Sequence, residues 1–148
     1  MIEQAFSKKL VSSLSMTGEL ENFDKIVQHW IDTSEKDYQT MQNLMKSGDY
    51  SWALFIGHLV LEKLLKAHFV KFNKIHAIFT HDLLRLATKA GLEFNEETAE
   101  WLDEISTFNI NARYANYKQD FYKHCTKEFA IQWTDRIEKL RLWLIKEF

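Results

Sequence analysis

The fold of this chain is decided by residues 50–73, YSWALFIGHLVLEKLLKAHFVKFN. Apolar side chains recur through this stretch at spacings of three and four and cover a wide arc, which predicts a central, buried helix. The stretch also carries a polar stripe, because His58, Glu62 and Lys66 are four residues apart and share one helix face. A glutamate four residues before a lysine often forms an ion pair worth about 0.2–0.5 kcal/mol. The stripe therefore indicates either such a pair or a face that borders a cleft or a second subunit.

Amphipathic patterns before this stretch predict two further helices. An apolar side chain every four residues over 2–14 predicts an N-terminal helix, and residues 15–19 are expected to break it. A second helix is predicted over 23–46. Gly48 fits the left-handed position after that helix, and Asp49 is expected to cap the following helix through its carboxylate. This short turn predicts an antiparallel helical hairpin.

The C-terminal half predicts more helices and an irregular connection. Thr80 is expected to cap a short helix that stops at Gly91, and Asn95 is expected to begin another helix. Residues 109–125 are expected to be irregular, and apolar positions over 129–144 predict the last helix. No segment keeps a period of two. The sequence therefore predicts an all-α fold, an up-down helical bundle of four to five main helices plus short helices.

Length and composition favour a small reduced protein. A length of 148 residues suits a single domain over 1–148, with an N-terminal helix extension over 1–18 and a core over 23–148. The lone Cys125 cannot form an internal disulfide, which favours a reducing, cytoplasmic setting. Charged residues such as Glu62 interrupt the longest apolar run, and the N-terminus lacks an apolar signal core. Neither a membrane span nor a signal peptide is expected.

Charge is unevenly distributed along a chain whose net charge is only −2. Residues 19–37 hold six acids and two bases, and residues 92–106 hold six acids and no base. Residues 58–89 hold six bases and two acids, and residues 113–146 hold eight bases and four acids. The two base-rich segments would form one positive surface if they lie side by side. Otherwise they are solvated helix faces.

Several short motifs follow one another in order along the chain. They are Trp30 with Asp37-Tyr38, Gly48-Asp49-Tyr50 with Ala53 and Phe55, LEKLLKA over 61–67, HDLLRL over 81–86, and NARY over 111–114. Together these motifs resemble the HEPN domain over roughly residues 23–148. The resemblance implies a bundle that forms a homodimer. It also implies binding to a minimal nucleotidyltransferase, often in a toxin–antitoxin-type system, and many members of the family are metal-independent endoribonucleases.

The resemblance also identifies a candidate phosphate site. Ribonuclease activity in the family rests on an arginine and a later histidine with four to six residues between them, paired across the dimer cleft. Arg113 stands where the family's arginine is expected, but Lys118, Gln119 and Asp120 occupy the positions where the histidine is expected. None of these three does the work of a histidine near neutral pH. The nearest downstream histidine is His124. The resemblance therefore implies phosphate binding, without a nuclease of its own.

We therefore expect RNA or nucleotide phosphate to bind at four basic residues and a tyrosine, namely Arg113, Lys118, Lys66, Lys63 and Tyr114. A cleft or dimer interface is expected to include His58, Glu62 and Tyr117. Neither a cofactor nor a metal is expected. The alternative is a metal-independent endoribonuclease that uses Arg113 with His124 or His58. Arg113 could instead pair with an acid such as Asp120 and order the loop around it.

A different function is suggested by the order of histidines and acids. His58, His81 with Asp82, and a later Asp103 or Asp120 mimic the ligands of helical metal-dependent phosphohydrolases. Their spacing is loose, and Asp82 is also explained by a helix start, where a carboxylate favours the dipole. The other histidines have no pattern of partners and are expected to be surface or packing residues: His29, His68 and His76.

Overall fold

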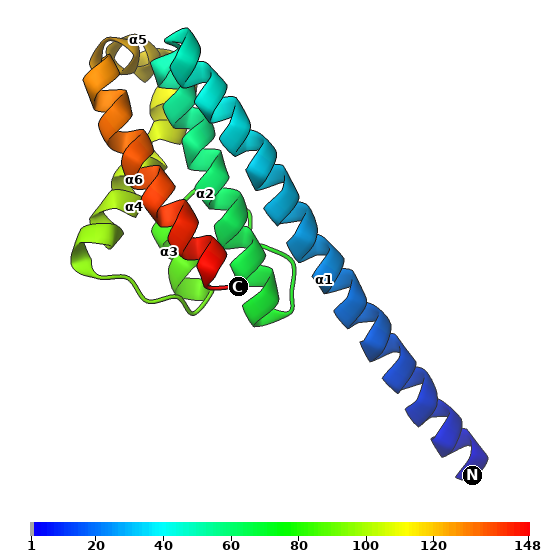
Figure 1. The fold of residues 1–148 in the computed structure, drawn as a ribbon. Helices are drawn as coiled ribbons and strands as arrows, with labels where there is room; N and C mark the ends of the chain where they lie inside the picture. The colour runs from blue at the N-terminus through cyan, green and yellow to red at the C-terminus, as the bar shows by residue number, and fades with distance from the viewer. Residues whose placement is uncertain (1) are drawn as a thin grey trace.

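The computed structural model describes the backbone of residues 2–148, with the side chains of residues 22–148. The described chain contains six α-helices and no strand, which confirms the all-α helical bundle (Figure 1). The helices are α1 (Ile2–Ser47), α2 (Tyr50–Asn73), α3 (Leu83–Lys89), α4 (Glu96–Arg113), α5 (Ala115–His124) and α6 (Lys127–Lys146).

Helix α2 is the centre of the bundle, as its wide apolar arc predicts. It packs against α1, α3, α4 and α6. Gly57 allows both α1 and α6 to approach α2 closely, because a Cβ atom at this position would lie 2.6 Å from Ile137 Cδ1 and 3.0 Å from Met41 Sδ. The buried Ser34 hydroxyl of α1 donates to the Val60 carbonyl of α2 at 2.8 Å. Apolar packing and one buried hydrogen bond therefore fix α1 on α2.

The turn between α1 and α2 forms the predicted hairpin, but its cap differs from the prediction. Gly48 has a φ of +82°, the left-handed conformation that the sequence predicted. The Asp49 carboxylate makes no hydrogen bond to the first turn of α2, so the predicted cap is wrong. It accepts the Ser47 hydroxyl at 2.5 Å instead. The carboxylate is therefore oriented toward the preceding residues.

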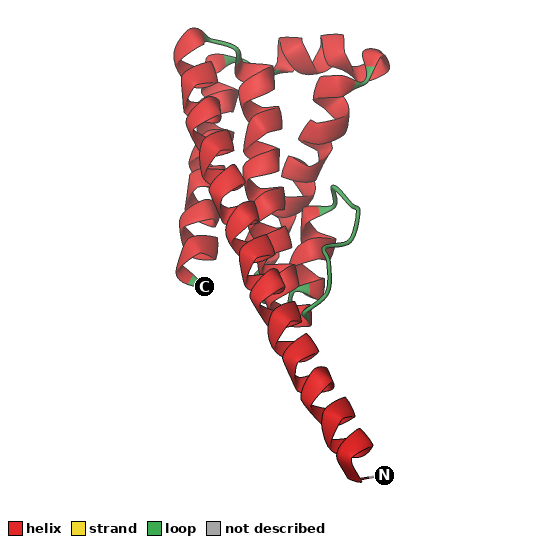
Figure 2. Cartoon of the chain, turned by 90° about the vertical axis from the view of Figure 1, so that its right-hand side faces the viewer, coloured by secondary structure: helices red, strands yellow, loops and turns green. Residues whose placement is uncertain are grey.

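The predicted break over residues 15–19 is wrong, because α1 runs without interruption from Ile2 to Ser47. Gly18 lies in this segment. A single glycine costs a helix about 1 kcal/mol relative to alanine, which a long helix without proline tolerates. The N-terminal end of α1 extends past the other helices (Figures 1 and 2). The apolar repeat predicted over residues 2–14 lies outside the described side chains.

The cap of α3 also differs from the prediction. Asp82, rather than Thr80, is the N-cap residue, and its carboxylate accepts the Arg85 backbone N–H at 3.1 Å. The Thr80 hydroxyl accepts the Asp82 N–H at 3.2 Å, so it supports the capping residue. The predicted stop at Gly91 is confirmed by its φ of +74°. The predicted start at Asn95 is confirmed by its side chain, which accepts the Thr98 N–H at 2.8 Å.

The segment 109–125 is helical, and the predicted irregular connection is wrong. Helix α4 continues to Arg113, and α5 follows after Tyr114 alone, whose φ of −87° and ψ of 132° separate the two helices. Phe121 is the only buried residue of α5. A helix with one buried side chain has almost no apolar period, so the sequence pattern could not identify it.

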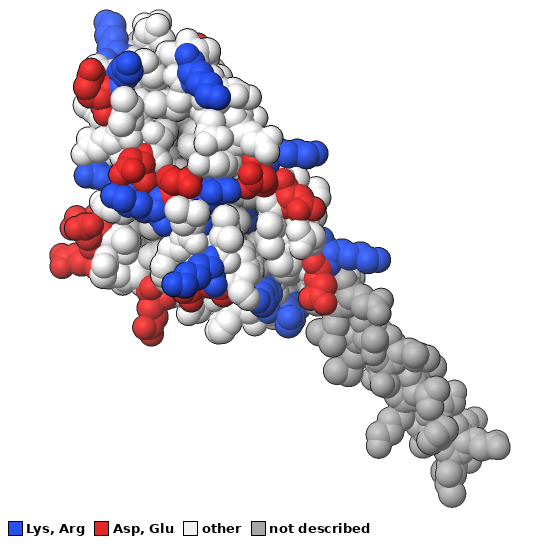
Figure 3. Space-filling model, viewed as in Figure 1, with Lys and Arg blue, Asp and Glu red and all other residues white. Residues whose placement is uncertain are grey.

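The two base-rich segments do lie side by side, since α2 packs against α6. Four of their basic side chains are nevertheless paired with acids, those of Lys63, Lys66, Lys139 and Arg141. Lys63 Nζ lies 2.6 Å from Asp37 Oδ2, and Arg141 Nη2 lies 2.5 Å from Glu35 Oε2. Basic and acidic groups are accordingly intermixed on the face drawn in Figure 3. In the described part of the chain, no helix combines the length and the apolar character that crossing a membrane requires.

Candidate functional site

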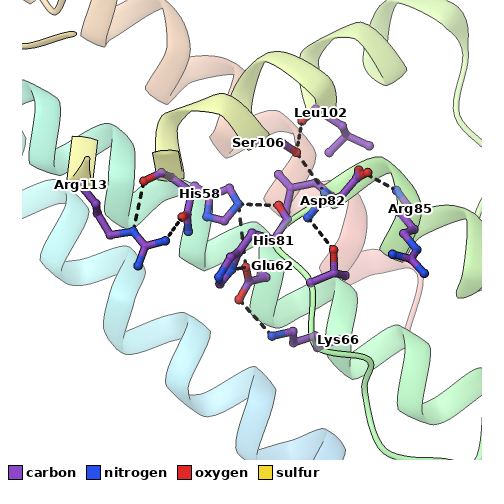
Figure 4. A network of polar contacts seen from close by, with 12 residues as sticks. His58, Glu62, Lys66, His81, Asp82, Arg85, Leu102, Ser106 and Arg113 are labelled. Atoms are coloured by element: carbon purple, nitrogen blue, oxygen red, sulfur yellow. Dashed lines mark hydrogen bonds and ion pairs between the residues drawn. The ribbon is translucent and has the colours of Figure 1, made fainter. Parts of the chain in front are cut away.

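The polar stripe of α2 is buried and binds the loop between α2 and α3. Glu62 is 4% exposed, and its two carboxylate oxygens have separate partners. His81 Nδ1 donates to one oxygen at 2.6 Å, and Lys66 Nζ donates to the other at 3.1 Å (Figure 4). A buried carboxylate is stabilised only when paired in this way. Glu62 therefore attaches a residue of the 74–82 loop to the central helix.

The His58 side chain binds the backbone of the same loop residue, His81. The His58 side chain is fully buried, and its Nε2 lies 2.9 Å from the His81 carbonyl oxygen. Because a carbonyl only accepts, Nε2 carries the proton, and the buried Nδ1 has no hydrogen-bond partner. Burial lowers the pKa of His58, and the nearby charges of His81 and Arg113 add to this, whereas Glu62 opposes it. A neutral His58 and a buried Glu62 thus fix both the backbone and the ring of His81.

The two lysines of α2 that were predicted to bind phosphate are both paired with acids. Lys66 is 8% exposed, and its ammonium also lies 5.3 Å from the centre of the Trp30 ring. Lys63 is bound to Asp37. The predicted ion pair within α2 is therefore present. His58 and Glu62, placed by the sequence at a cleft or dimer interface, lie inside the bundle.

A pocket of about 410 Å³ lies beside this buried network. Its walls come from the start of α3 and the last turns of α4: His81, Asp82, Asp103, Ser106, Thr107, Asn109, Ile110, Arg113 and Tyr114. The His81 side chain is 40% exposed at this wall, although Glu62 holds its Nδ1 from behind. His81 thus connects the buried stripe to the open pocket.

Arg113 is held in place by Asn109, one turn earlier in α4. The Arg113 Nε donates to the Asn109 carbonyl at 3.2 Å, and Nη2 donates to the side-chain oxygen of the buried Asn109. The guanidinium carbon lies 5.8 Å from the Phe55 ring centre and 5.7 Å from that of Tyr114. Among the described residues no acid lies within ion-pair distance of Arg113, so the suggested pair with Asp120 is not formed.

A family model described as HEPN domain matches residues 27–148, which is well over half of the chain. The chain belongs to the HEPN family. Its fold is also similar to the crystal structure of TT1696 from Thermus thermophilus, with a TM-score of 0.71 and 19% sequence identity. That match covers 82% of this chain and 98% of the other, and at this identity it shows the fold alone. No curated protein sequence matches the chain.

The histidine nearest to Arg113 downstream does not share the pocket of this HEPN domain. His124 lies with Asp120 and Tyr117 along a second hollow of about 260 Å³ on α5 and the end of α4. Lys118 is also outside the lining of the Arg113 pocket, and its Nζ lies 5.3 Å from the Trp52 ring centre. Arg113 and Tyr114 therefore share the larger pocket, whereas Tyr117 and His124 border the smaller one.

The ligand set of a metal-dependent phosphohydrolase is not assembled in this HEPN domain. His58 is enclosed and bound to a carbonyl, and Asp82 is used as a helix cap. Asp103 and Asp120 border different pockets. Among the residues that the structure describes, no three His, Cys, Asp or Glu side chains form a group able to hold a metal ion.

The remaining histidines and the cysteine are structural or exposed. His68 Nε2 lies 2.7 Å from the Leu144 carbonyl oxygen, its ring stacks on Phe148, and burial lowers its pKa. His29 and His76 are exposed, and His76 lies edge-on to Phe23. Burial raises the pKa of the Cys125 thiol to about 12, so this residue is not a nucleophile near neutral pH.

Sequence reasoning missed how two site residues are used. His81 was predicted as part of the HDLLRL motif, as a metal ligand or as part of a helix start, and Asn109 was assigned to an irregular segment. The spacing of His58 and Glu62 showed that they share a face. Their common partner is His81, which comes 23 residues after His58 and 19 residues after Glu62. It lies outside the helix that carries them, so the helical period gives no sequence signal for this contact.

Proposed function

We propose that this HEPN protein binds the phosphate of RNA or of a nucleotide in the pocket lined by Arg113. The main support is the state of Arg113, whose guanidinium is oriented by Asn109 and has no acidic partner among the described residues. A planar guanidinium with free N–H groups suits the oxygens of a phosphate. Holding the side chain beforehand lowers the entropy lost when a ligand binds.

A tyrosine and a lysine near Arg113 extend the proposed contact surface. Tyr114 is 55% exposed at the pocket wall, where a base could stack on its ring. Lys118 is exposed above Trp52 and would reach a phosphate farther along a strand. Lys63 and Lys66 remain weaker candidates, because their ammonium groups already bind Asp37 and Glu62. Binding that depends on phosphates should weaken as salt concentration rises.

The proposal is tested by measuring the affinity of the full chain for a short fluorescent RNA. Losing a charge-assisted hydrogen bond costs about 1.5–3 kcal/mol, so Arg113→Ala should weaken binding roughly 10- to 100-fold. Lys123→Ala is the matched control, because it removes one exposed positive charge from α5 that does not line the Arg113 pocket. Equal losses in the two variants would show nonspecific attraction only, and an unchanged affinity in Arg113→Ala would refute the proposed site.

We also propose that the protein forms a homodimer and binds a minimal nucleotidyltransferase, in a toxin–antitoxin-type system. This part is supported by membership of the HEPN family. Cleavage by the family's arginine–histidine pair is not included, because Lys118, Gln119 and Asp120 replace the histidine. Light scattering at high protein concentration should give twice the mass of the chain, and a strict monomer would contradict the dimer. A neighbouring gene for a short nucleotidyltransferase, with copurification of its product, would support the partner.

A further inference from the structure

We propose that the Arg113 pocket selects nucleotides that carry a guanine base, and that Asp103 is the residue that determines this specificity. The inference rests on the proposed function, because it takes a phosphate bound by Arg113 as its starting point. It goes beyond that function by naming the base beside the phosphate and the group that recognises it.

The first argument is that the pocket carries opposite charges along one face of α4. Its lining residues at spacings of three and four share this face: Asp103, Ser106, Thr107, Ile110 and Arg113. Asp103 and Arg113 are ten residues apart, which is about 15 Å along a helix axis. The Leu83 N–H donates to the Ser106 hydroxyl at 3.0 Å, so the start of α3, with Asp82, meets the Asp103 half of this face (Figure 4). A ligand that is anionic at one end and donates hydrogen bonds at the other fits this arrangement.

The second argument is that Asp103 is the free acid of the pocket lining. The hydroxyls of Ser106 and Thr107 each donate to a backbone carbonyl of their own helix, at 2.8 Å and 2.6 Å. The Asp82 carboxylate caps α3. The Asp103 side chain is exposed and forms no ion pair within residues 22–148. Its carboxylate is therefore available to a ligand, and an ionised carboxylate only accepts hydrogen bonds.

The third argument is a buried amide that fixes the direction of the ligand. Asn109 lines the pocket and is 1% exposed. Because a guanidinium only donates, the amide oxygen faces Arg113, and the amide nitrogen is left as a donor that no residue within 22–148 accepts. Asn109 and Arg113 thus both present donors to phosphate oxygens. The base then extends along α4 toward Asp103.

Guanine is the base whose pairing edge matches a carboxylate. Its ring N1–H and its exocyclic amino group are neighbouring donors, which the two carboxylate oxygens accept together. Adenine and cytosine place a ring nitrogen lone pair beside their amino group, and uracil places its one N–H between two carbonyl oxygens. The carboxylate of Asp103 therefore meets a repulsive atom on each of these three bases, which is how a site rejects a wrong ligand.

The middle of the pocket suits the body of a nucleotide. Ile110 is 49% exposed between the two charged residues and gives the base or ribose an apolar surface. Tyr114 lies beyond Arg113 on the same helix side and remains available to a neighbouring base of an RNA strand. One guanosine between Arg113 and Asp103 is therefore compatible with the strand contacts proposed above.

The experiment measures the affinity of the full chain for short fluorescent strands of uridine with one central guanine, hypoxanthine or adenine. Hypoxanthine differs from guanine only by lacking the exocyclic amino group. The guanine strand should bind roughly 10-fold or more tightly than the adenine strand, with the hypoxanthine strand in between. Asp103→Asn should abolish this preference for guanine.

Glu104→Gln is the matched control, because it removes the same charge from the adjacent exposed acid of α4, which does not line the pocket. Removing an acid raises the affinity of the chain for every strand, so the readout is the ratio of affinities for guanine and adenine. This ratio should be unchanged in Glu104→Gln.

The outcomes separate this inference from the proposed function. If the three strands bind equally and Arg113→Ala weakens all of them, the inference is overturned and the binding proposal stands. If no strand binds, both fail. If the preference for guanine persists in Asp103→Asn, or is lost equally in Glu104→Gln, Asp103 does not determine the specificity. Thermal unfolding of each variant shows whether a changed ratio reflects a changed fold.

Discussion

At the scale of single residues, the central feature is a carboxylate buried among three nitrogen-bearing side chains. Glu62 has Lys66 at 3.1 Å, His81 at 2.6 Å and His58 at 3.9 Å. Such a cluster adds little net stability compared with apolar packing, because desolvation offsets most of the attraction. Removing one member is costly, however, because the others stay buried without their partner. The cluster is therefore better explained by the position that it gives His81.

Because removing one member of the cluster leaves the others buried without a partner, Glu62→Ala should cause a large loss of stability. The substitution leaves the ammonium of Lys66 buried without its carboxylate, so we expect the free energy of unfolding to fall by about 3–5 kcal/mol. Urea denaturation followed by circular dichroism measures this change. Lys139→Ala is the control, because the Lys139–Asp135 pair is 64% and 60% exposed and should contribute under about 1 kcal/mol. Similar losses in both variants would contradict the role of burial.

The buried histidines predict that stability falls in mild acid. Burial lowers the pKa of His58 and of His68 below 6.5, so the unfolded chain takes up protons that the folded chain does not. The free energy of unfolding should therefore decrease as pH falls below about 6.5, and the loss is complete below the folded pKa. Burial is the main cause of the lowered pKa of His58; the hydrogen bond to the His81 carbonyl and the charge of Glu62 favour its protonation, whereas the charges of His81 and Arg113 oppose it.

Denaturation curves at a series of pH values test this expectation. His58→Gln keeps a donor for the His81 carbonyl but cannot titrate, so its stability should depend less steeply on pH between 7 and about 5.5. An identical slope in wild type and variant would mean that folding does not change the pKa of His58.

At the scale of elements, helix caps separate what sequence can predict from what it cannot. Asn95 was predicted as a cap from its side chain and the acids that follow it, and its hydrogen bond to Thr98 confirms this. The same reasoning failed for Asp49, because Ser47 binds its carboxylate. When a side chain has two possible partners nearby, local geometry decides which hydrogen bond it forms. Helix α5 was missed for a different reason, since only Phe121 of that helix is buried and the sequence shows no apolar period there.

Asn95, which caps its helix, and Asp49, which does not, provide a matched pair of substitutions. Asn95→Ala removes a hydrogen bond to the first turn of α4 and should destabilise the protein by about 1 kcal/mol. Asp49→Ala removes an exposed side chain that makes no such bond to α2 and should have a clearly smaller effect. Thermal or urea unfolding of the two variants under one condition compares them. Equal losses would mean that the cap hydrogen bond is not what stabilises α4.

At the scale of the whole molecule, α1 is held to the bundle by contacts along its second half. Ser34 donates to Val60 in α2, and Asp37 pairs with Lys63. The guanidinium of Arg141 in α6 lies 3.7 Å from the centre of the Tyr38 ring. The match to the HEPN family likewise begins at residue 27. Membership of a bundle could be predicted from the apolar periods, whereas the length of α1 could not, because Gly18 resembles a helix end.

This distribution predicts that a chain starting at Asn22 keeps the fold. It retains Ser34, Asp37 and Tyr38, together with the edge contact between Phe23 and His76. We therefore expect the same thermal midpoint as the full chain and a helical circular dichroism spectrum. A chain starting at Gln39 is the contrast, because it lacks these contacts of Ser34, Asp37 and Tyr38 with α2 and α6, and it should unfold at a much lower temperature. A marked drop in the midpoint of the longer version would show instead that residues 2–21 contribute to the stability of the bundle.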